Sequence, residues 1–438
     1  MAVGQSPPYA SATHQAPSPP MKKTEVEVIS SDTVKPSSPT PPLLRRYPLS
    51  FLDQISPPVY MPLLLFFSHP LAPDALLRLK HSLSHTLTRY YPLAGRIRDN
   101  TFIDCDDDGV LFLEARTSSH LSALTTESIC TEELNRFLPL EVDSADDLPL
   151  AVQATAFNCG GLALGLCFSH KVADALSLLV FITAWATMAR GDPDAAPRPR
   201  FDSATLFPPR NLSGFAPRTG ITENIVARRY VFSATAIEVL RERYSDRGAR
   251  PTRVEALSAF IWTRFAAATI CEGGRPGPVQ HAVNLRTRME PQLPESSFGN
   301  YYRIAVTAAP GTAETDGREI VGEIRKVLRG IDGEYVRRLR DGEEHLRFIK
   351  ERAERFKRGE VVSFSFTSLC RFPLYEEADF GWGAAEWVTS ARLPFRNLVS
   401  FMDAKRGGGV EVWVNLTEED MAKFEKDEKF KEFASQTH

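Results

Sequence analysis

The sequence places a histidine at the end of an apolar run, where its imidazole could accept a proton. The run Gly161–Ser169 leads directly to His170, and Asp174 follows four residues later. Because histidine titrates near neutral pH, an imidazole at the mouth of a buried strand can serve as a general base. A His-x-x-x-Asp pair also arises by chance, with the aspartate capping the helix that follows. On these residues alone, the structural alternative is favoured.

A second motif, far downstream, changes this balance. Residues Asp379–Gly383 read Asp-Phe-Gly-Trp-Gly, and two glycines around an aromatic residue predict a tight turn that sets the Trp382 indole against a neighbour. Asp-Phe-Gly also occurs in protein kinases. The sequence has neither a Gly-rich phosphate loop nor a His-Arg-Asp catalytic loop, so kinase chemistry is excluded.

Together the two motifs resemble those of the BAHD acyltransferases, plant enzymes that transfer an acyl group from coenzyme A to an alcohol or amine. Further blocks occur in the family's order, and the resemblance extends from about Glu25 to the C-terminus. These blocks are Leu49–Asp53, Tyr91–Arg96, Arg253–Trp262, Asn284–Met289 and Ser297–Asn300. The last three are most similar to the subgroup that contains vinorine synthase, whose members often use acetyl-CoA.

The resemblance implies two chloramphenicol acetyltransferase-like α/β domains with mixed sheets and an active-site channel between them. Alternating strand and helix patterns in both halves of the sequence independently favour α/β layers. We expect a disordered extension over 1–24, an N-terminal domain with the His-x-x-x-Asp motif over 25–190, a proline-rich linker over 191–214 and a C-terminal domain with the Asp-Phe-Gly-Trp-Gly motif over 215–438. A plastid transit peptide within residues 1–20 is the alternative for the extension, weakened by the absence of arginine there.

Periodicity predicts the main elements. We expect a helix over Ala75–Tyr90, adjacent strands over Leu150–Phe157 and Leu162–Phe168, and a helix that begins after His170 and ends at Gly191. Asp108-Gly109 suggests the turn of a hairpin over 102–113. The sequence also predicts a long charged helical region near 321–356 and a closing helix over 418–433.

By the resemblance, His170 takes the proton from the acceptor while the acceptor oxygen attacks the thioester carbonyl directly, without metal or covalent intermediate. Such help is typically worth roughly 10²–10⁴-fold in rate. The resemblance gives Asp174 a structural part: it points away from the base and pairs with Arg286, which holds the loop that carries His170. The donors that stabilise the oxyanion are not identified by the sequence, and the Trp382 indole N–H is one candidate.

The resemblance also bears on the second motif and on coenzyme A. Asp379 is a candidate second acid/base residue, while the family's loop, with Gly381, Trp382 and Gly383, has a structural part in shaping the channel. Ala384-Ala385 replaces the usual Lys-Pro after the motif, which puts the loop geometry in question. Arg253, beside Thr252, is a candidate contact to a coenzyme A phosphate, and a packing role for Arg253 is equally favoured.

Composition restricts the partners. A formal net charge of −3 without a large basic cluster argues against nucleic-acid binding, and no apolar run approaches the ~20 residues of a membrane span. Six scattered cysteines fit a reduced, cytoplasmic protein, which we expect to be monomeric. His81 and His85 have a spacing that can bind zinc, but Ser82 stands where a zinc-protease helix has glutamate, so surface histidines and no metal are expected.

The sequence therefore predicts an acyl-CoA-dependent O-acyltransferase that acts on a small-molecule alcohol, with acetyl-CoA as the expected co-substrate. An N-acyltransferase acting on an amine acceptor is the alternative within this class. A catalytically silent family member and a hydrolase are alternatives from other classes. The sequence has no Gly-x-Ser-x-Gly nucleophile elbow that would support an esterase.

Overall fold

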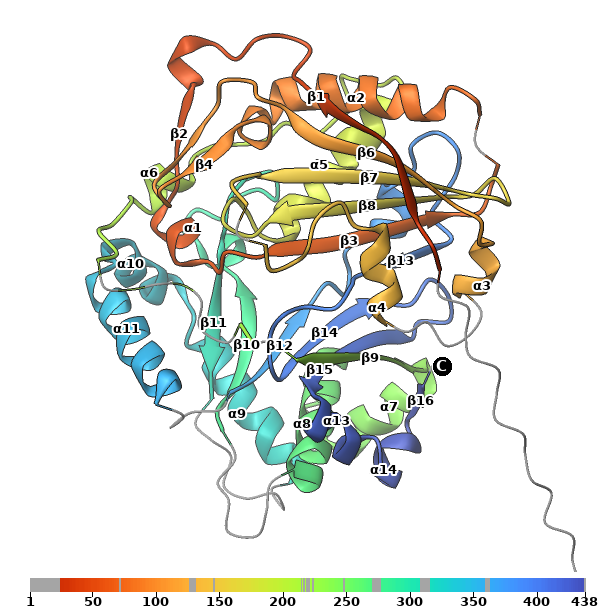
Figure 1. Ribbon diagram of the computed structural model, residues 1–438. Coiled ribbons are helices and arrows are strands. Elements are labelled where there is room, and N and C mark those ends of the chain that lie inside the picture. Colours follow the sequence, from red (N-terminus) through yellow and green to blue (C-terminus); the bar gives the residue numbers. More distant parts are fainter. Residues whose placement is uncertain are drawn as a thin grey trace, which may run out of the picture.

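The computed structural model describes residues 24–70, 72–125, 131–144, 146–213, 215, 217, 221–222, 224–246, 249–269, 277–307, 316–358 and 363–436. Two large β-sheets, each with helices packed against it, form the two halves seen in the upper and lower parts of Figure 1. The predicted mixed α/β architecture is confirmed. The expected disordered extension lies outside the described residues except for Thr24.

The upper sheet has six strands in the order β1-β6-β7-β8-β3-β13, and only the β6–β7 pair is parallel. Helices α2 (Ala75–Arg89) and α5 (Ala175–Ala189) cover one face of it. The predicted neighbouring strands are β7 and β8, which pair antiparallel. The strands are β1 (Glu27–Val34), β6 (Val110–Thr117), β7 (Leu150–Phe157), β8 (Leu162–Ser169), β3 (Tyr60–Phe67) and β13 (Trp387–Thr389).

The core of the upper half lies between this sheet and the two helices. Leu79, Leu83 and Leu87 of α2, spaced as the sequence predicts, are fully buried there. Trp185 of α5 is also fully buried, and its indole N–H donates to the Leu79 carbonyl at 3.2 Å. Because α5 packs firmly on the sheet, the loop between β8 and α5 is anchored at both ends.

The lower sheet has seven strands in the order β11-β10-β12-β14-β15-β9-β16, mostly antiparallel, with parallel β10–β12 and β12–β14 pairs. Its apolar core includes residues of α7, α8, α9, α13 and α14. The strands are β11 (Tyr302–Val306), β10 (Val279–Asn284), β12 (Phe364–Ser368), β14 (Leu398–Asp403), β15 (Val410–Thr417), β9 (Ile225–Phe232) and β16 (Ala434–Gln436). The helices are α7 (Ala234–Arg243), α8 (Arg253–Thr269), α9 (Gly317–Arg329), α13 (Glu418–Phe424) and α14 (Glu428–Lys431).

The chain crosses between the halves near its end. Strand β13 comes late in the sequence, yet it pairs with β3 in the upper sheet, where Phe66 stacks on Trp387 with ring centroids 5.2 Å apart. Trp413 of β15 belongs to the same apolar cluster. The second half of the sequence therefore supplies part of the upper half of the molecule.

Three predicted elements differ from the structure. The predicted hairpin over 102–113 is wrong, because β5 (Phe102–Asp104) pairs with β2 (Arg46–Pro48) and β4 (Arg96–Arg98) in a small separate sheet, while β6 joins the large one. The turn residue itself is present, since Gly109 has φ +93°. An Asp-Gly turn specifies a reversal of the chain, and here the strands on its two sides have different partners.

The long charged helical region is divided into three helices. They are α9, α10 (Gly333–Asp341) and α11 (Glu343–Lys357), and Gly342 with φ +77° separates the last two. The closing helix is likewise divided into α13 and α14. Shorter elements are η1 (Pro42–Leu44), α1 (Phe51–Ile55), η2 (Tyr91–Ala94), α3 (Leu121–Thr125), α4 (Thr131–Leu134), η3 (Asn135–Phe137), α6 (Ser203–Leu206), η4 (Arg286–Arg288) and α12 (Leu374–Glu377).

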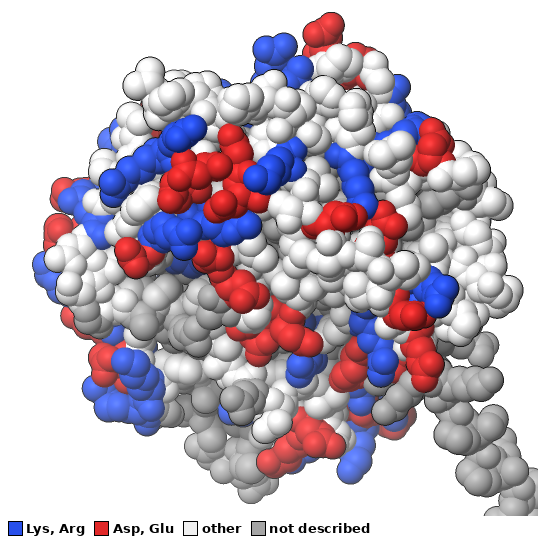
Figure 2. Space-filling view, turned by 45° about the horizontal axis from the view of Figure 1, so that its top comes forward, with Lys and Arg blue, Asp and Glu red and all other residues white. Residues whose placement is uncertain are grey.

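The face shown in Figure 2 carries acidic and basic side chains side by side, without a broad patch of one sign. None of the helices in the described residues combines the length and apolar character that a membrane span requires. The cysteines in the described residues are free thiols: Cys105, Cys159, Cys167 and Cys370.

Candidate active site

His170 lies one residue past the end of β8, where the strand leads into the loop before α5. Its backbone N–H donates to the Val59 carbonyl at 2.9 Å, which ties it to the residue before β3. Its ring stacks on Tyr302 of β11 in the lower sheet, with centroids 5.1 Å apart and the planes 26° from parallel. The imidazole therefore stands where the two halves of the molecule meet.

The contacts of the ring determine which nitrogen carries the proton. Nδ1 lies 3.3 Å from the Ala173 carbonyl and 3.1 Å from Oδ1 of Asn300. The amide nitrogen of Asn300 donates to Oδ1 of Asp53 and to the His170 carbonyl, both at 2.9 Å, so the amide oxygen must face the ring. Two acceptors facing Nδ1 place the proton there, and Nε2 has no hydrogen-bond partner among the described residues.

Burial lowers the pKa of the His170 imidazole below its ordinary value, and the charge of Asp174 and the contacts to Ala173 and Asn300 oppose this shift only in part. A lowered pKa keeps the ring neutral at neutral pH. With Nδ1 protonated, the lone pair of Nε2 is then available to accept a proton.

The Asp174 carboxylate forms its hydrogen bonds with groups other than the His170 ring. Its Oδ1 accepts the Ser177 N–H at 3.0 Å, which makes Asp174 the N-cap of α5. Its two oxygens accept the Arg286 guanidinium at 2.7 and 3.0 Å, and Oδ2 also accepts the Tyr301 N–H at 2.9 Å. The predicted ion pair between Asp174 and Arg286 is confirmed, as is the helix cap.

The Asp174–Arg286 pair is deeply buried, since Arg286 is only 1% exposed. Burial alone would raise the pKa of the Asp174 carboxyl, but the Arg286 guanidinium and the N–H donors of Ser177 and Tyr301 outweigh it and hold the pKa below its usual range. The Asp174 carboxylate therefore stays charged, and its ion pair with Arg286 holds the loop between His170 and α5 in place.

Two sequence blocks from the second half of the chain meet around this pair. Arg286 Nη2 donates to the Ser297 carbonyl at 2.8 Å, and the Gly299 carbonyl accepts from the Asp174 N–H at 3.3 Å. Gly299 has φ +138°, and a Cβ there would lie 2.9 Å from the Cβ of Ser203. The block Ser297–Asn300 can therefore close on the loop only with glycine at this position.

The sheet face next to His170 is open. Ala282 and Asn284 of β10 pair with β11, lie just past the Val279–His281 stretch that pairs with β12, and are exposed. Their exposure shows that the described residues leave this part of the sheet uncovered. Tyr302, which stacks on His170, is the register partner of Asn284 on this same face. Solvent, and hence a substrate, can reach the sheet surface beside the imidazole.

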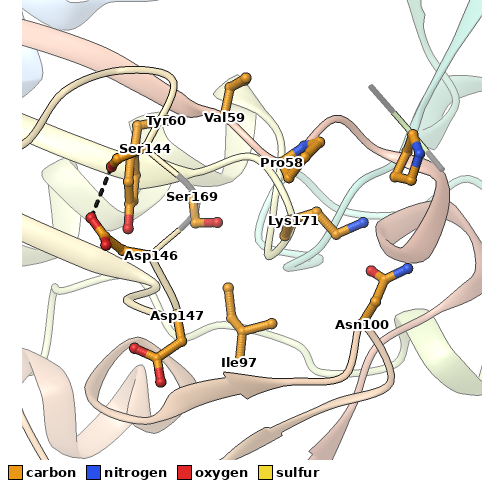
Figure 3. Close-up of a pocket in the computed structure, with 11 residues that line it drawn as sticks. Pro58, Val59, Tyr60, Ile97, Asn100, Ser144, Asp146, Asp147, Ser169 and Lys171 are labelled. Carbon is orange, nitrogen blue, oxygen red and sulfur yellow. Dashed lines mark hydrogen bonds between the residues drawn. The ribbon is translucent and has the colours of Figure 1, made fainter. Parts of the chain in front are cut away.

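A hollow of about 280 Å³ borders the end of β8, and its lining includes Ser169 and Lys171 but not His170. Figure 3 shows Lys171 extending between Pro58 and Asn100. The chain on both sides of His170 therefore borders this hollow, while the imidazole itself does not line it.

The structure places Asp379 far from His170. Trp382 packs against Phe67 with ring centroids 5.9 Å apart, and Phe67 pairs with Leu162 at the start of β8. Leu162 precedes His170 by eight residues, which corresponds to roughly 25 Å of extended strand. The candidate role of Asp379 as a second acid/base residue is therefore wrong, and its role is structural.

The contacts of Asp379 show what it holds. Its Oδ1 accepts the backbone N–H groups of Gly381 and Gly383 at 2.8 and 2.9 Å, and its carbonyl accepts from Arg190. Both glycines have positive φ, +97° and +101°, which closes the predicted tight turn. The Trp382 indole is likewise excluded as an oxyanion donor, since its ring packs at the far end of β8.

The two residues assigned to coenzyme A have structural partners of their own. Thr252 and Glu255 cap the N-terminus of α8 reciprocally, with N–H to oxygen distances of 2.8 and 3.2 Å. Arg253 donates to Asp403 at 2.7 Å and remains 29% exposed. A phosphate contact by Arg253 stays a prediction, and a ligand there would compete with Asp403.

No group of three or more histidine, cysteine or acidic side chains in the described part of the chain could hold a metal ion. His81 and His85 do face each other on α2, with their Nε2 atoms 3.3 Å apart.

Sequence reasoning missed three residues near His170. In the sequence, Asn300 and Asp53 are the last residues of two blocks that resemble the family, and Lys171 belongs to no block. Asp53 and Lys171 are both buried, although acidic and basic residues rarely are. An aspartate three residues after Ser50 is a capping-box signal that could have placed Asp53 at the start of a helix, while the sequence around Lys171 and Asn300 carries no such signal.

The comparisons with known proteins agree with this geometry. The model of the Transferase family matches residues 24–431. The chain belongs to the BAHD acyltransferase family. Stemmadenine O-acetyltransferase of Catharanthus roseus is 37% identical over 422 residues, which cover 92% of this chain and 97% of that protein. Vinorine synthase of Rauvolfia serpentina is 35% identical over 416 residues, covering 91% and 96%.

Solved structures give the same result for the fold of this BAHD enzyme. The crystal structure of vinorine synthase superposes with a TM-score of 0.80 at 35% identity, covering 91% of this chain and 96% of that one. F. graminearum TRI101 complexed with ethyl coenzyme A superposes with a TM-score of 0.68 at 17% identity, covering 90% and 99%. The predicted fold and the predicted family are confirmed.

Proposed function

We propose that this enzyme transfers an acyl group, most simply acetyl, from a coenzyme A thioester to a hydroxyl of a small plant metabolite. The observation that carries the proposal is the state of His170: Nδ1 faces two acceptors, and Nε2 is unpaired beside an open sheet face. Nε2 takes the hydroxyl proton as the oxygen attacks the thioester carbonyl carbon. The tetrahedral intermediate then collapses, the C–S bond breaks, and the coenzyme A thiolate leaves and takes up the proton.

Relatives support the acetyl donor and the hydroxyl acceptor. Several are O-acetyltransferases by name, including those that act on stemmadenine and on limonoids. In the distant TRI101 structures coenzyme A is bound on the same fold, which supports coenzyme A as the carrier here. We further propose that the enzyme works as a monomer in the cytosol; the free thiols among the described cysteines support the reducing compartment.

The experiment is an incubation of the purified protein with acetyl-CoA and a panel of alkaloid and terpenoid alcohols. Free thiol is followed by colour reaction and acetylated product by mass spectrometry, with the His170→Ala variant alongside. Thiol and ester released in equal amounts by the parent protein, and neither by the variant, is the expected result. Thiol without ester would indicate a hydrolase, acetylated amines alone would indicate an N-acyltransferase, and no product from a broad donor and acceptor panel would contradict transfer.

A further inference from the structure

Lys171, the residue directly after His170, is buried. It is only 6% exposed, and its Nζ donates to the carbonyl oxygens of Asp53, Gln54 and Ser56 at 2.9, 2.7 and 3.0 Å. Three carbonyl acceptors use all three N–H bonds of an ammonium group. These carbonyls lie at the C-terminal end of α1, where the Asp53 carbonyl also accepts the N–H of Ser56 and the Gln54 carbonyl the side-chain amide of Asn100. Lys171 therefore fastens α1 to the end of the strand that carries the base.

Placing an ammonium group here is unfavourable by itself. Burial lowers the pKa of the Lys171 ammonium to about 7, and the negative charge of Asp53 opposes this. An apolar side chain of similar length would fill the same space without that cost. The position therefore requires the hydrogen bonds of the lysine, and not only its volume.

Helix α1 carries Asp53, whose carboxylate determines the orientation of Asn300. Oδ1 of Asp53 accepts both the backbone N–H and the side-chain amide of Asn300 at 2.9 Å, while Oδ2 accepts the N–H and hydroxyl of Ser50 at 2.9 and 2.6 Å. With its amide nitrogen held by Asp53, Asn300 must present its oxygen to Nδ1 of His170, 3.1 Å away. A continuous set of hydrogen bonds thus joins Lys171, α1, Asp53 and Asn300 to the ring.

We propose that Lys171 and Asp53 are positioning residues for His170, which fix the Asn300 amide and so keep the proton of the ring on Nδ1. The inference rests on the proposed function, in which Nε2 is the base. If the amide turned over, its NH₂ group would face Nδ1 and favour the tautomer with the proton on Nε2. That tautomer cannot accept a proton from an acceptor hydroxyl.

This anchor is separate from the Asp174–Arg286 pair. Arg286 and Asp174 hold the far end of the loop, next to α5, while Lys171 holds the near end against α1. The loop that carries the ring is thus held at one end by the buried Asp174–Arg286 ion pair and at the other by the hydrogen bonds of Lys171 to α1. Asp53 contributes through its hydrogen bonds to Asn300, and burial raises the pKa of its carboxyl.

The test uses the full-length protein with Lys171→Met, Lys171→Arg and Asp53→Asn, and with Lys80→Met as the matched control. Lys80 is a partly buried lysine on α2 that pairs with Asp32 and Glu114, remote from the base. Two quantities are measured: kcat and KM for acetyl-CoA and one accepted alcohol, and the tautomer of His170 by NMR of ¹⁵N-histidine-labelled protein, with His170→Gln to assign its signals.

We expect Lys171→Met and Asp53→Asn to lower kcat by at least about tenfold, a part of the roughly 10²–10⁴-fold that a general base contributes, with KM changed less than about twofold. Their His170 signals should show an increased Nε2–H population. Lys171→Arg should recover part of kcat, and Lys80→Met should match the parent. If Lys171→Met does not fold, the proposal is tested by Asp53→Asn alone, which is isosteric with the parent residue.

The proposal is overturned if a folded Lys171→Met or Asp53→Asn protein keeps the kcat and the Nδ1–H tautomer of the parent. A loss of kcat without a change of tautomer would also overturn it, since the two residues would then affect turnover without determining which nitrogen carries the proton. Because the tautomer is read without turnover, a parent that shows Nδ1–H but no transfer would instead contradict the proposed function.

Discussion

The loops that carry His170 and Asp379 each contain an aspartate that binds backbone N–H groups, and the two aspartates differ in what else they hold. Asp174 also neutralises a guanidinium that is 1% exposed, so its charge is required inside the protein. Asp379 lies in a partly exposed turn and accepts only the N–H groups of two glycines through its side chain. The same residue type thus supports a buried charge in one loop and a surface turn in the other.

Because the two aspartates hold different groups, substitutions around them should reduce the stability of the protein by different amounts. Removing one partner of a buried pair leaves the other charge unpaired, whereas removing an acceptor at a partly exposed turn lets water replace it. A residue that moves protons responds in a third way, because its loss lowers turnover without unfolding the protein.

The largest stability effect is expected at the Asp174–Arg286 pair. Arg286→Met should lower the free energy of unfolding by about 3–5 kcal/mol, since it leaves the Asp174 carboxylate buried without its partner. Urea denaturation followed by circular dichroism measures this. The control Arg228→Met removes an arginine that forms a half-exposed pair with Glu425, and its effect should be at most about 1 kcal/mol.

The double variant Asp174→Asn/Arg286→Met sharpens this result. It removes both charges, and it should be more stable than Arg286→Met alone. An Arg286→Met protein as stable as Arg228→Met would show that the pair does not hold the loop.

A smaller effect is expected at the second motif. Asp379→Ala should lower the free energy of unfolding by about 1–3 kcal/mol, because two N–H groups lose their acceptor. Asp379→Asn keeps an acceptor oxygen and should recover most of the stability and nearly all of kcat. Thermal denaturation and initial rates are measured on the parent, Asp379→Ala and Asp379→Asn. A catalytic acid or base at Asp379 would instead lose its turnover in the asparagine variant as fully as in the alanine variant.

The smallest expected effect is on the pH dependence of kcat/KM. The pKa of His170 is lowered by burial, so kcat/KM should fall on the acid side only below the ordinary histidine value of 6.5, as the ring gains a proton and can no longer accept one. The midpoint is measured from rate profiles that extend from acid to mildly alkaline pH. Asp379→Asn should leave it unchanged. A midpoint above 6.5, or one moved by Asp379→Asn, would contradict this assignment of the two loops.

The sequence predicted the elements that depend on local patterns. The largely apolar stretches of β7 and β8, the cap at Asp174 and the glycine after α5 each have a signal within a few residues, and the structure contains all of them. The pairing of Asp174 with Arg286 was predicted only through the family resemblance, since nothing in the two segments specifies their contact.

The remaining features depend on contacts between distant parts of the chain. Asp53 and Asn300 are 247 residues apart, and neither segment shows that the two side chains meet. Strand β13 is three residues long, and its partner β3 lies in the other half of the chain, so periodicity had no basis for the pairing. The hairpin error has the same origin, because a turn signal reports a reversal of the chain but not the partners of its strands.

The most direct test of the central claim is chemical rescue with free imidazole. Turnover of His170→Ala and of Asp379→Ala is measured with acetyl-CoA and an accepted alcohol, in the presence and absence of added imidazole. Our account predicts that imidazole raises the turnover of His170→Ala, by filling the vacated space beside the open sheet face, and leaves that of Asp379→Ala unchanged. A His170→Ala protein that turns over at the rate of the parent without imidazole, or one that imidazole leaves inactive while acetate restores Asp379→Ala, would contradict the account.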